Sequence, residues 1–289
     1  NLEDSKYGNK RGDELPDELK NLEKQEEKIK SALDELREQK TQLKNELLAK
    51  RKEEGKKEKL NKTEEKQIEK MKINITDHDA KYMKERNGCI KTNYNAQAAV
   101  DEENQFIVSS DVITDCNDKK QLEPMIKQSA ENLGCNIDMC KADSGYHSGE
   151  VLGKMAEQDI DFLIDDPLKN RIDNENYKYE KVNFKYDAET DTYTCPEGHL
   201  MEMISEKQNE KKYQCEHCCD CPAKSECVKS KNKRQIIRGK YEINIEENRE
   251  KLLSEEGKEE YKKRMHTVEP VFGNIKFNLG FRQFLLRGI

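Results

Sequence analysis

The first 70 residues carry apolar side chains at a regular helical spacing. From Leu19 onward the pattern alternates between intervals of three and four residues, with Glu26 and Lys40 filling two of its positions. Its apolar members are Leu22, Ile29, Leu33, Leu36, Leu43 and Leu47. These intervals are those of the a and d positions of a heptad, so the pattern predicts a long helix with a coiled-coil seam.

Two breaks divide this first segment. Pro16 favours a helix start close to it, and Gly55, within a basic run, predicts a turn. A second, less apolar helix is expected over residues 56–71. We therefore expect residues 1–72 to form a helical hairpin or coiled-coil arm. A dedicated DNA-binding arm is the alternative, which the mixed charges of the segment disfavour.

The pattern changes at Ile73 and becomes that of a mixed α/β domain. Residues 94–101 and 105–113 alternate like two strands joined by a turn at 101–104, which predicts an antiparallel hairpin. A helix, an extended stretch, a second helix and a buried strand are then expected at 119–133, 136–142, 149–158 and 161–164. This order predicts the first part of an α/β core over residues 73–167. Helical spacing returns from Asn244 to Phe281.

Composition and charge qualify this picture. Charged residues make up 39% of the 289 and hydrophobic residues 33%, so one core through the whole chain is excluded. The net charge of −7 argues against phosphate binding on average, but the C-terminal third is electropositive. Residues 229–240 hold six basic side chains and no acid, and 261–289 hold six against the single acid Glu269. DNA contacts are therefore expected from this third, at Lys231, Lys233, Arg234 and Arg282.

The ten cysteines are unevenly placed. Six fall between Cys195 and Cys227, and CxxC spacing without a signal peptide favours metal binding over disulfides. A tetrahedral Zn²⁺ site is predicted within a Cys-rich insertion over residues 168–240, with Cys195, Cys218, Cys221 and Cys227 as ligands. Spare candidates are His199, Cys215, His217 and Cys219, and reduced or redox-active thiols are the alternative. With no apolar run of membrane-spanning length, the protein is expected in the cytoplasm.

Two acidic residues stand out by their surroundings. Asp143 follows a short apolar stretch and precedes Ser-Gly, where a carboxylate points out of a sheet edge as a metal ligand or caps a turn. Glu269 is a lone acid in the most basic segment, beside Arg264, Lys276 and Arg282. It is either an ion-pair partner or a metal ligand next to a phosphate-binding surface.

Three segments together resemble one known family. Residues 261–276, Tyr-Lys-Lys-Arg-Met-His-Thr-Val-Glu-Pro-Val-Phe-Gly-Asn-Ile-Lys, followed by 280–288, resemble the C-terminal catalytic signature of insertion-sequence DDE transposases. Residues 94–101 and 142–148 are similar to two other landmark segments of one branch. That branch also has a helical insertion and a cysteine-rich segment. The resemblance implies a ribonuclease H-like mixed sheet with helices, closed by a catalytic helix and basic tail at 241–289.

The resemblance also implies an activity and its residues. In the family three carboxylates hold two divalent metal ions, Mg²⁺ or Mn²⁺, about 3.5–4 Å apart, which clamp the attacking and leaving oxygens. Asp143 resembles the second acid and Glu269 the third, and the supporting residues match Tyr261, Arg264 and Lys276. The implied function is cleavage and strand transfer at insertion-sequence ends, by a homodimer on DNA in the bacterial cytoplasm and nucleoid.

Two departures from the family pattern bear on this function. Four residues, where the better-known signature has three, separate Arg264 from Glu269; a regular helix would place them about 140° apart, which leaves the role of Arg264 open. Glu269 and Lys276 would share a face. The first acid, expected in an Asp-Gly-Thr strand, is absent, and Asp101 is a doubtful substitute. We therefore expect an N-terminally truncated, inactive chain; the alternative is a non-catalytic DNA-binding or regulatory product.

Overall fold

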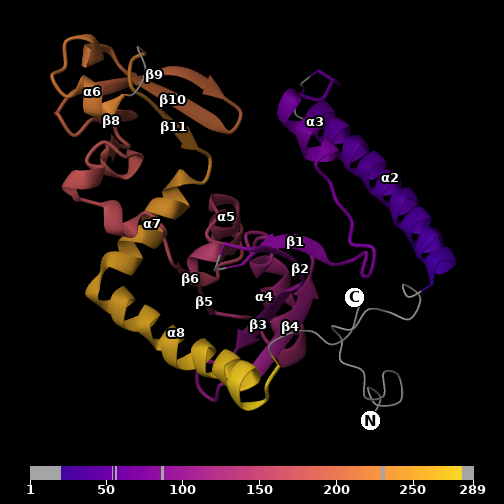
Figure 1. Ribbon diagram of the computed structural model, residues 1–289. Helices are drawn as coiled ribbons and strands as arrows, with labels where there is room; N and C mark the ends of the chain where they lie inside the picture. Colours follow the sequence, from indigo (N-terminus) through magenta and orange to yellow (C-terminus); the bar gives the residue numbers. More distant parts are fainter. Residues whose placement is uncertain (1–20, 54, 56, 86–87, 229–231, 282–289) are drawn as a thin grey trace. The chain divides into compact units, whose positions relative to one another are not determined.

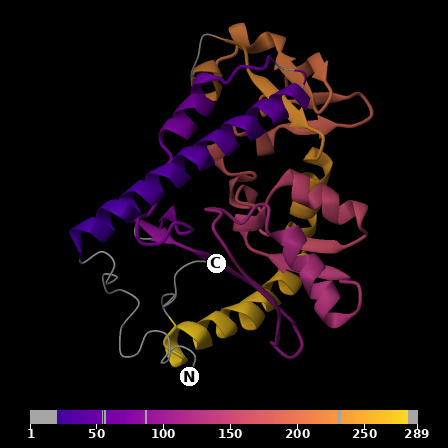
Figure 2. The same ribbon diagram turned by 90° about the vertical axis from the view of Figure 1, so that its right-hand side faces the viewer.

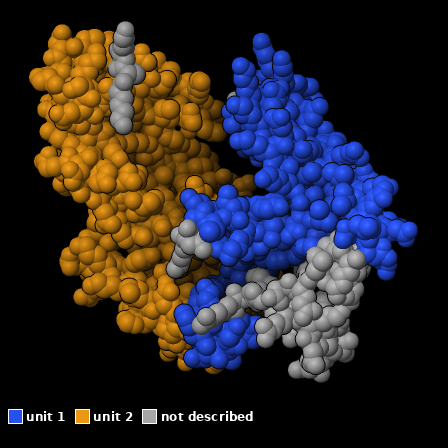
Figure 3. All heavy atoms as spheres, viewed as in Figure 1, with its two compact units in different colours: residues 1–98, 110–116, 272–289 blue, residues 99–109, 117–271 orange. Residues whose placement is uncertain are grey.

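The computed structural model describes residues 21–281 except 54, 56, 86–87 and 229–231. It divides into two compact units, shown in different colours in Figure 3. The first unit comprises 1–98, 110–116 and 272–289, and the second 99–109 and 117–271. Helices and strands alternate as the predicted α/β class requires. The predicted helix start near Pro16 lies outside the described residues. No helix among them is long and apolar enough to cross a bilayer.

The arm of the first unit consists of two helices, α2 (Leu22–Glu53) and α3 (Lys62–Glu69), which lie side by side (Figures 1 and 2). A turn at Gly55 separates them, as predicted. The second helix is shorter than expected because Asn61 caps it: its side chain accepts from the amide of Glu64, whose carboxylate accepts from the Asn61 amide. Arg51 then joins the helices through Glu64, at 3.1 Å.

The first unit also contains a small antiparallel pair, β1 (Lys81–Lys84) and β2 (Ile90–Asn93). It is linked to α2 by side chains, since Lys81 Nζ donates to Gln39 Oε1 at 3.3 Å and His78 contacts Glu35. The predicted hairpin follows as β3 (Asn95–Val100) and β4 (Ile107–Ile113), which pair with each other. Its open end belongs to the first unit and its turn to the second.

The core of the second unit is built on two parallel strands, β5 (Met139–Ala142) and β6 (Asp161–Ile164). Helices α4 (Leu122–Leu133) and α5 (Gly149–Glu157) bury their apolar faces against these strands. Gly134 ends α4 in the left-handed conformation that favours glycine, at φ +67°. The buried side chains are Leu122, Ile126, Ala142, Val151, Leu152, Met155, Phe162 and Ile164.

Two C-terminal helices follow, α7 (Glu242–Leu253) and α8 (Glu255–Gly273), and a π-helical turn at Asn274–Asn278. The fully buried Asn248 of α7 donates to the carbonyl of Ile164 at 2.8 Å and accepts from its amide at 3.0 Å. Its carboxamide thus completes the hydrogen bonding of β6 in place of a further strand. Arg249 pairs with the buried Asp166 at 2.5 Å and fixes the same helix.

The Cys-rich segment forms a five-stranded antiparallel sheet in the order β11-β10-β9-β8-β7. In chain order these strands are β7 (Lys185–Asp187), β8 (Thr192–Thr194), β9 (Leu200–Lys207), β10 (Glu210–Cys215) and β11 (Gln235–Gly239). This segment has an apolar centre of its own. A second core of Phe184, Tyr193, Met201, Tyr213, Cys215, Cys218 and Ile236 fills it, because tyrosine rings supply the buried apolar surface.

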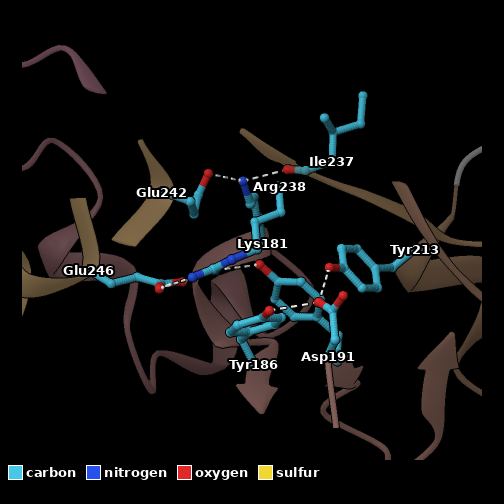
Figure 4. Close-up of polar contacts among 9 residues, drawn as sticks. Lys181, Tyr186, Asp191, Tyr213, Ile237, Arg238, Glu242 and Glu246 are labelled. Atoms are coloured by element: carbon cyan, nitrogen blue, oxygen red, sulfur yellow. Dashed lines mark hydrogen bonds and ion pairs between the residues drawn. The ribbon is translucent and has the colours of Figure 1, made fainter. Parts of the chain in front are cut away.

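Polar contacts complete this sheet and tie it to α7 (Figure 4). Asp191 accepts from Tyr186 at 2.7 Å and Tyr213 at 2.5 Å, so both ring hydroxyls find partners at the edge of the core. Arg238 stacks on Tyr186 at 3.7 Å and binds Glu246 of α7 through two nitrogens, at 2.6 and 2.7 Å. The remaining short elements are α6 (Lys224–Cys227) and the 3-10 turns Ser144–Tyr146, Lys169–Arg171, Glu175–Tyr177, Lys181–Asn183 and Glu216–Cys219.

Candidate active site

Asp143 lies at the carboxyl end of β5, where parallel strands commonly present ligand-binding groups. Its Oδ1 accepts from the Gly145 amide at 2.9 Å, which turns the chain away and leaves the carboxylate half exposed. A Cβ at Gly145 would lie 2.9 Å from both Asp143 Oδ1 and Asp118 Oδ2. A side chain at position 145 would therefore displace these two carboxylates.

Helix α8 supplies the opposite side of the site. The Tyr261 hydroxyl donates to the carbonyl of Ala142 at 3.1 Å, directly before Asp143, and burial raises the pKa of Tyr261 to about 12. Arg264, with 16% of its side chain exposed, reaches both acids. Its Nη2 lies 3.5 Å from Asp143 Oδ2 and its Nη1 3.7 Å from Glu269 Oε1. One guanidinium thus stands between the two predicted catalytic carboxylates.

A charged cluster fixes α8 against β5. Lys141 is two residues before Asp143, so it projects from the same side of the strand, and only 8% of its side chain is exposed. It donates to Glu260 of α8 at 2.5 Å and to Glu102 in the β3–β4 turn. Lys263 pairs with the same Glu260 at 2.6 Å. Sequence reasoning missed this cluster, although strand alternation places Lys141 on the face of Asp143.

Two further residues predicted for the site, Asp101 and Lys276, have other local surroundings. Asp101 caps the β3–β4 turn, where its Oδ2 accepts from the Asn104 amide at 2.7 Å. Lys276 lies in the π-helical turn after α8, with its ammonium 5.2 Å from the ring of Phe272. The prediction that Glu269 and Lys276 share a helix face assumed a regular α-helix through both residues. The α-helix ends at Gly273, before Lys276.

The predicted DNA-binding residues fall into two groups. Lys231 and Arg282 lie outside the described residues. Lys233 pairs with Glu216, and Arg234 turns inward, with Nη2 donating to the carbonyl of Tyr179 at 2.8 Å and Nη1 to that of Cys227 at 3.4 Å. A basic run in the sequence reveals charge but not the direction of each side chain, so the DNA contact of Arg234 stays a prediction.

The cysteines predicted to bind zinc line one small cavity of about 20 Å³ in the second unit. Its cysteine lining comprises Cys195, Cys215, Cys218, Cys221 and Cys227. Burial raises the pKa of Cys227, and the neighbouring Cys218, Cys195 and Cys221 add to that rise. All five thiols are free of disulfides. Among the described residues, no three Cys, His, Asp or Glu side chains stand close enough to hold a metal without moving.

Comparison with known proteins places the C-terminal part of this site in a family. Residues 194–289 match the family described as "Transposase DDE domain", a region that contains Arg264 and Glu269 but begins after Asp143. No curated protein and no solved structure gives a significant match. The matched segment covers the last strands of the Cys-rich sheet, α7 and α8, which agrees with the signature seen in residues 261–288. Over residues 194–289, the chain is therefore similar to the DDE domain of transposases.

Proposed function

We propose that this chain carries the ribonuclease H-like catalytic domain of an insertion-sequence transposase, which cleaves DNA at the element's ends and joins them to a target. The order of elements supports this: a hairpin, then β5 and β6 with their helices, then a long helix bearing an acid. One observation carries the proposal. Asp143 and Glu269, far apart in the sequence, both lie within 4 Å of the Arg264 guanidinium.

The two acids suit a divalent cation of the Mg²⁺ or Mn²⁺ type. Both are carboxylates, the ligands that these ions prefer, and 50% and 62% of their side chains are exposed, which leaves them open to water and phosphate. They already gather around one positive charge. Bound ions would stabilise the charge that develops on the attacking and leaving oxygens.

The other residues of the site would position the reactants. Tyr261 holds α8 to the end of β5 through its hydrogen bond to the Ala142 carbonyl. Lys141 holds the same part of α8 to this strand through Glu260. Arg264, a planar donor already next to both acids, is suited to a phosphate oxygen of the DNA backbone. The enzyme would act as a homodimer on DNA, in the cytoplasm and nucleoid.

A strand-cleavage assay tests this function. We would incubate the protein with supercoiled DNA bearing its own element ends and Mn²⁺ or Mg²⁺, beside Asp143→Asn and Glu269→Gln. Asp138→Asn, directly before β5, and Glu259→Gln, on α8, change exposed acids and are the matched controls. We expect Mn²⁺ binding, measured by electron paramagnetic resonance, to weaken in the two site variants alone, and any nicking to disappear with it. Equal binding in all variants would contradict the proposal.

The rival function is that of a non-catalytic DNA-binding product, which the inward-facing Arg234 and the paired Lys233 do not favour. It predicts salt-dependent DNA binding with no dependence on Asp143 or Glu269. Binding of element ends that is unchanged by both variants, together with absent Mn²⁺ binding, would favour this rival.

We also propose a structural Zn²⁺ in the cysteine cavity, held by Cys195, Cys218, Cys221 and Cys227. The supporting observation is that these four side chains surround one cavity large enough for a single water-sized guest. Four thiolates leave no open position for a substrate, so the site would stabilise the sheet and take no part in the reaction. Zinc content near one per chain, in protein purified under reducing conditions, is expected.

A further inference from the structure

Two sulfur atoms of the cysteine cavity accept backbone hydrogen bonds. The amide of His199 donates to Cys195 Sγ at 3.3 Å, within a tight turn that Gly198 closes at φ +82°. The amide of Arg234 donates to Cys218 Sγ, also at 3.3 Å. Donors directed at sulfur stabilise a thiolate more than a neutral thiol, since hydrogen bonds to charged acceptors are stronger. The backbone around the cavity is thus arranged for negative sulfur.

The side chain of Arg234 lines the same cavity. Its guanidinium stacks on the ring of Phe184 at 5.1 Å and donates to two carbonyls, but its Nε is buried without a hydrogen-bond partner. Within the part of the chain that the structure describes, it makes no ion pair with an Asp or Glu side chain. A buried cation with an unsatisfied donor is costly unless a negative group stands beside it.

The cavity lining includes one carboxylate, Glu197, which pairs with Lys178 at 2.8 Å. The sulfurs are therefore the groups beside Arg234 that could carry that charge. A divalent ion held by four thiolates bears a net charge of two negative units, since four thiols lose their protons on binding. Such sites are stabilised by donors and cations around the ligands. The two carbonyl groups that Arg234 contacts accept hydrogen bonds from it. Because they are neutral, they do not balance its positive charge.

We infer that Arg234 is the counter-charge of a thiolate metal site, and that it positions the cavity for the metal instead of contacting DNA. This inference rests on the proposed Zn²⁺ site. It explains why an arginine within a basic, DNA-type run is directed inward onto Phe184 and the cysteines. Arg234 is a positioning residue, because none of its atoms would bind the metal.

The test compares Arg234→Met, which keeps the long apolar stem and removes the charge, with Arg234→Lys, which keeps the charge. Lys185→Met is the matched control, since Lys185 is exposed on β7 and does not line the cavity. Zinc release from the reduced whole chain would be followed with a chromophoric chelator. We expect release from Arg234→Met to be about 10–100 times faster, Arg234→Lys to recover most of that loss, and the control to match wild type.

Two further measurements separate charge compensation from a purely structural role. Co²⁺-loaded protein should show a shifted thiolate-to-metal charge-transfer band in Arg234→Met and an unshifted one in the control. The melting temperature of loaded protein should fall more than that of metal-free protein. Unchanged release, or equal falls in both forms, would overturn the role of Arg234 while the zinc site stands. Wild-type protein that holds no zinc would overturn both, and the proposed transposase chemistry would be untouched.

Discussion

Replacement of Lys141 by Met tests whether the charged cluster beneath the site holds α8 in place. The Lys141 ammonium is almost fully buried and lies between Glu260 of α8 and Glu102 of the hairpin turn. Met preserves the length and apolar stem of the side chain while it removes the charge. The two carboxylates would then face each other with only Lys263, which lies 2.6 Å from Glu260 and 3.8 Å from Glu102, to compensate.

The expected cost follows from the exposure of the partners. Removal of one member of a fully buried ion pair costs about 3–5 kcal/mol, whereas an exposed pair contributes roughly 0–1 kcal/mol. Here 31% of Glu260 and 45% of Glu102 are exposed, so solvent screens both carboxylates in part. We therefore expect Lys141→Met to lower the free energy of unfolding by about 1–3 kcal/mol. Lys258→Met, which breaks an exposed pair within the same helix, should cost much less.

The loss of stability in Lys141→Met should also depend on pH. Hydrogen bonds from Lys141 and then Lys263 hold the pKa of Glu260 below its usual 4.5. A carboxyl group with a lowered pKa contributes stability above its unfolded pKa and loses it as the pH falls. The difference between wild type and Lys141→Met should therefore be full at pH 7 and shrink below about pH 4.5.

Urea unfolding at pH 7 and below about pH 4.5 measures the free energy of unfolding. Hydrogen exchange shows which part of the protein is destabilised. Amides of α8 around Tyr261 and Arg264 should exchange faster in Lys141→Met, while those of the β7–β11 sheet should not change. A double variant with Glu260→Leu should cost less than the sum of the single changes, because the two side chains interact. Additive costs, or exchange that rises equally in the sheet, would refute the role of this cluster.

Three further outcomes are expected. Gly145→Ala should weaken Mn²⁺ binding with little effect on folding, because its Cβ would press on the carboxylates of Asp118 and Asp143; unchanged binding would contradict their proximity. Wild-type stability should fall as the pH drops below about 6.5, because burial lowers the pKa of His147 and the unfolded chain takes up the proton first; His147→Gln should flatten that slope in urea titrations. Arg238→Met should lower the melting temperature of the Cys-rich sheet, which circular dichroism would detect, because it breaks the link to α7.

The sequence predicted elements well where one periodic pattern determines them. Strand β6 has the predicted ends, 161 and 164, because its apolar run is bounded by acidic residues. Helices α4 and α5 differ from their predicted ends by three residues or fewer. Tyr-rich short strands were expected in residues 168–235, but their pairing into the five-stranded β7–β11 sheet was not predicted. Its core depends on Tyr193 and Tyr213, whose rings are buried while their hydroxyls bond to Arg238 and Asp191, a pairing that spacing alone does not reveal.

The site shows the same division. Asp143 and Glu269 were predicted as catalytic acids because each occupies an unusual place in the chain, one after a strand and one within a basic run, and because both match the family's signature; their catalytic role stays a prediction. The sequence did not reveal the charged cluster of Lys141, Glu260 and Glu102. Lys141 is separated from Glu102 by 39 positions and from Glu260 by 119, and ion pairs over such separations leave no local pattern. Arg234 was assigned to DNA for a related reason: its neighbours in sequence are basic, but its neighbours in space are sulfur and aromatic rings.

The extra residue between Arg264 and Glu269 alters how these two side chains meet. Five positions apart, the two backbones lie about 7.5 Å apart along α8 and about 140° apart around it, so neither side chain stacks on the other. The structure still brings their charged ends to 3.7 Å, because both side chains are long. Arg264 reaches Asp143 on β5 as well, at a similar distance, and Tyr261 and Lys141 hold the helix at that strand. The altered spacing therefore changes the direction from which Arg264 meets Glu269, and it leaves the guanidinium between the two acids.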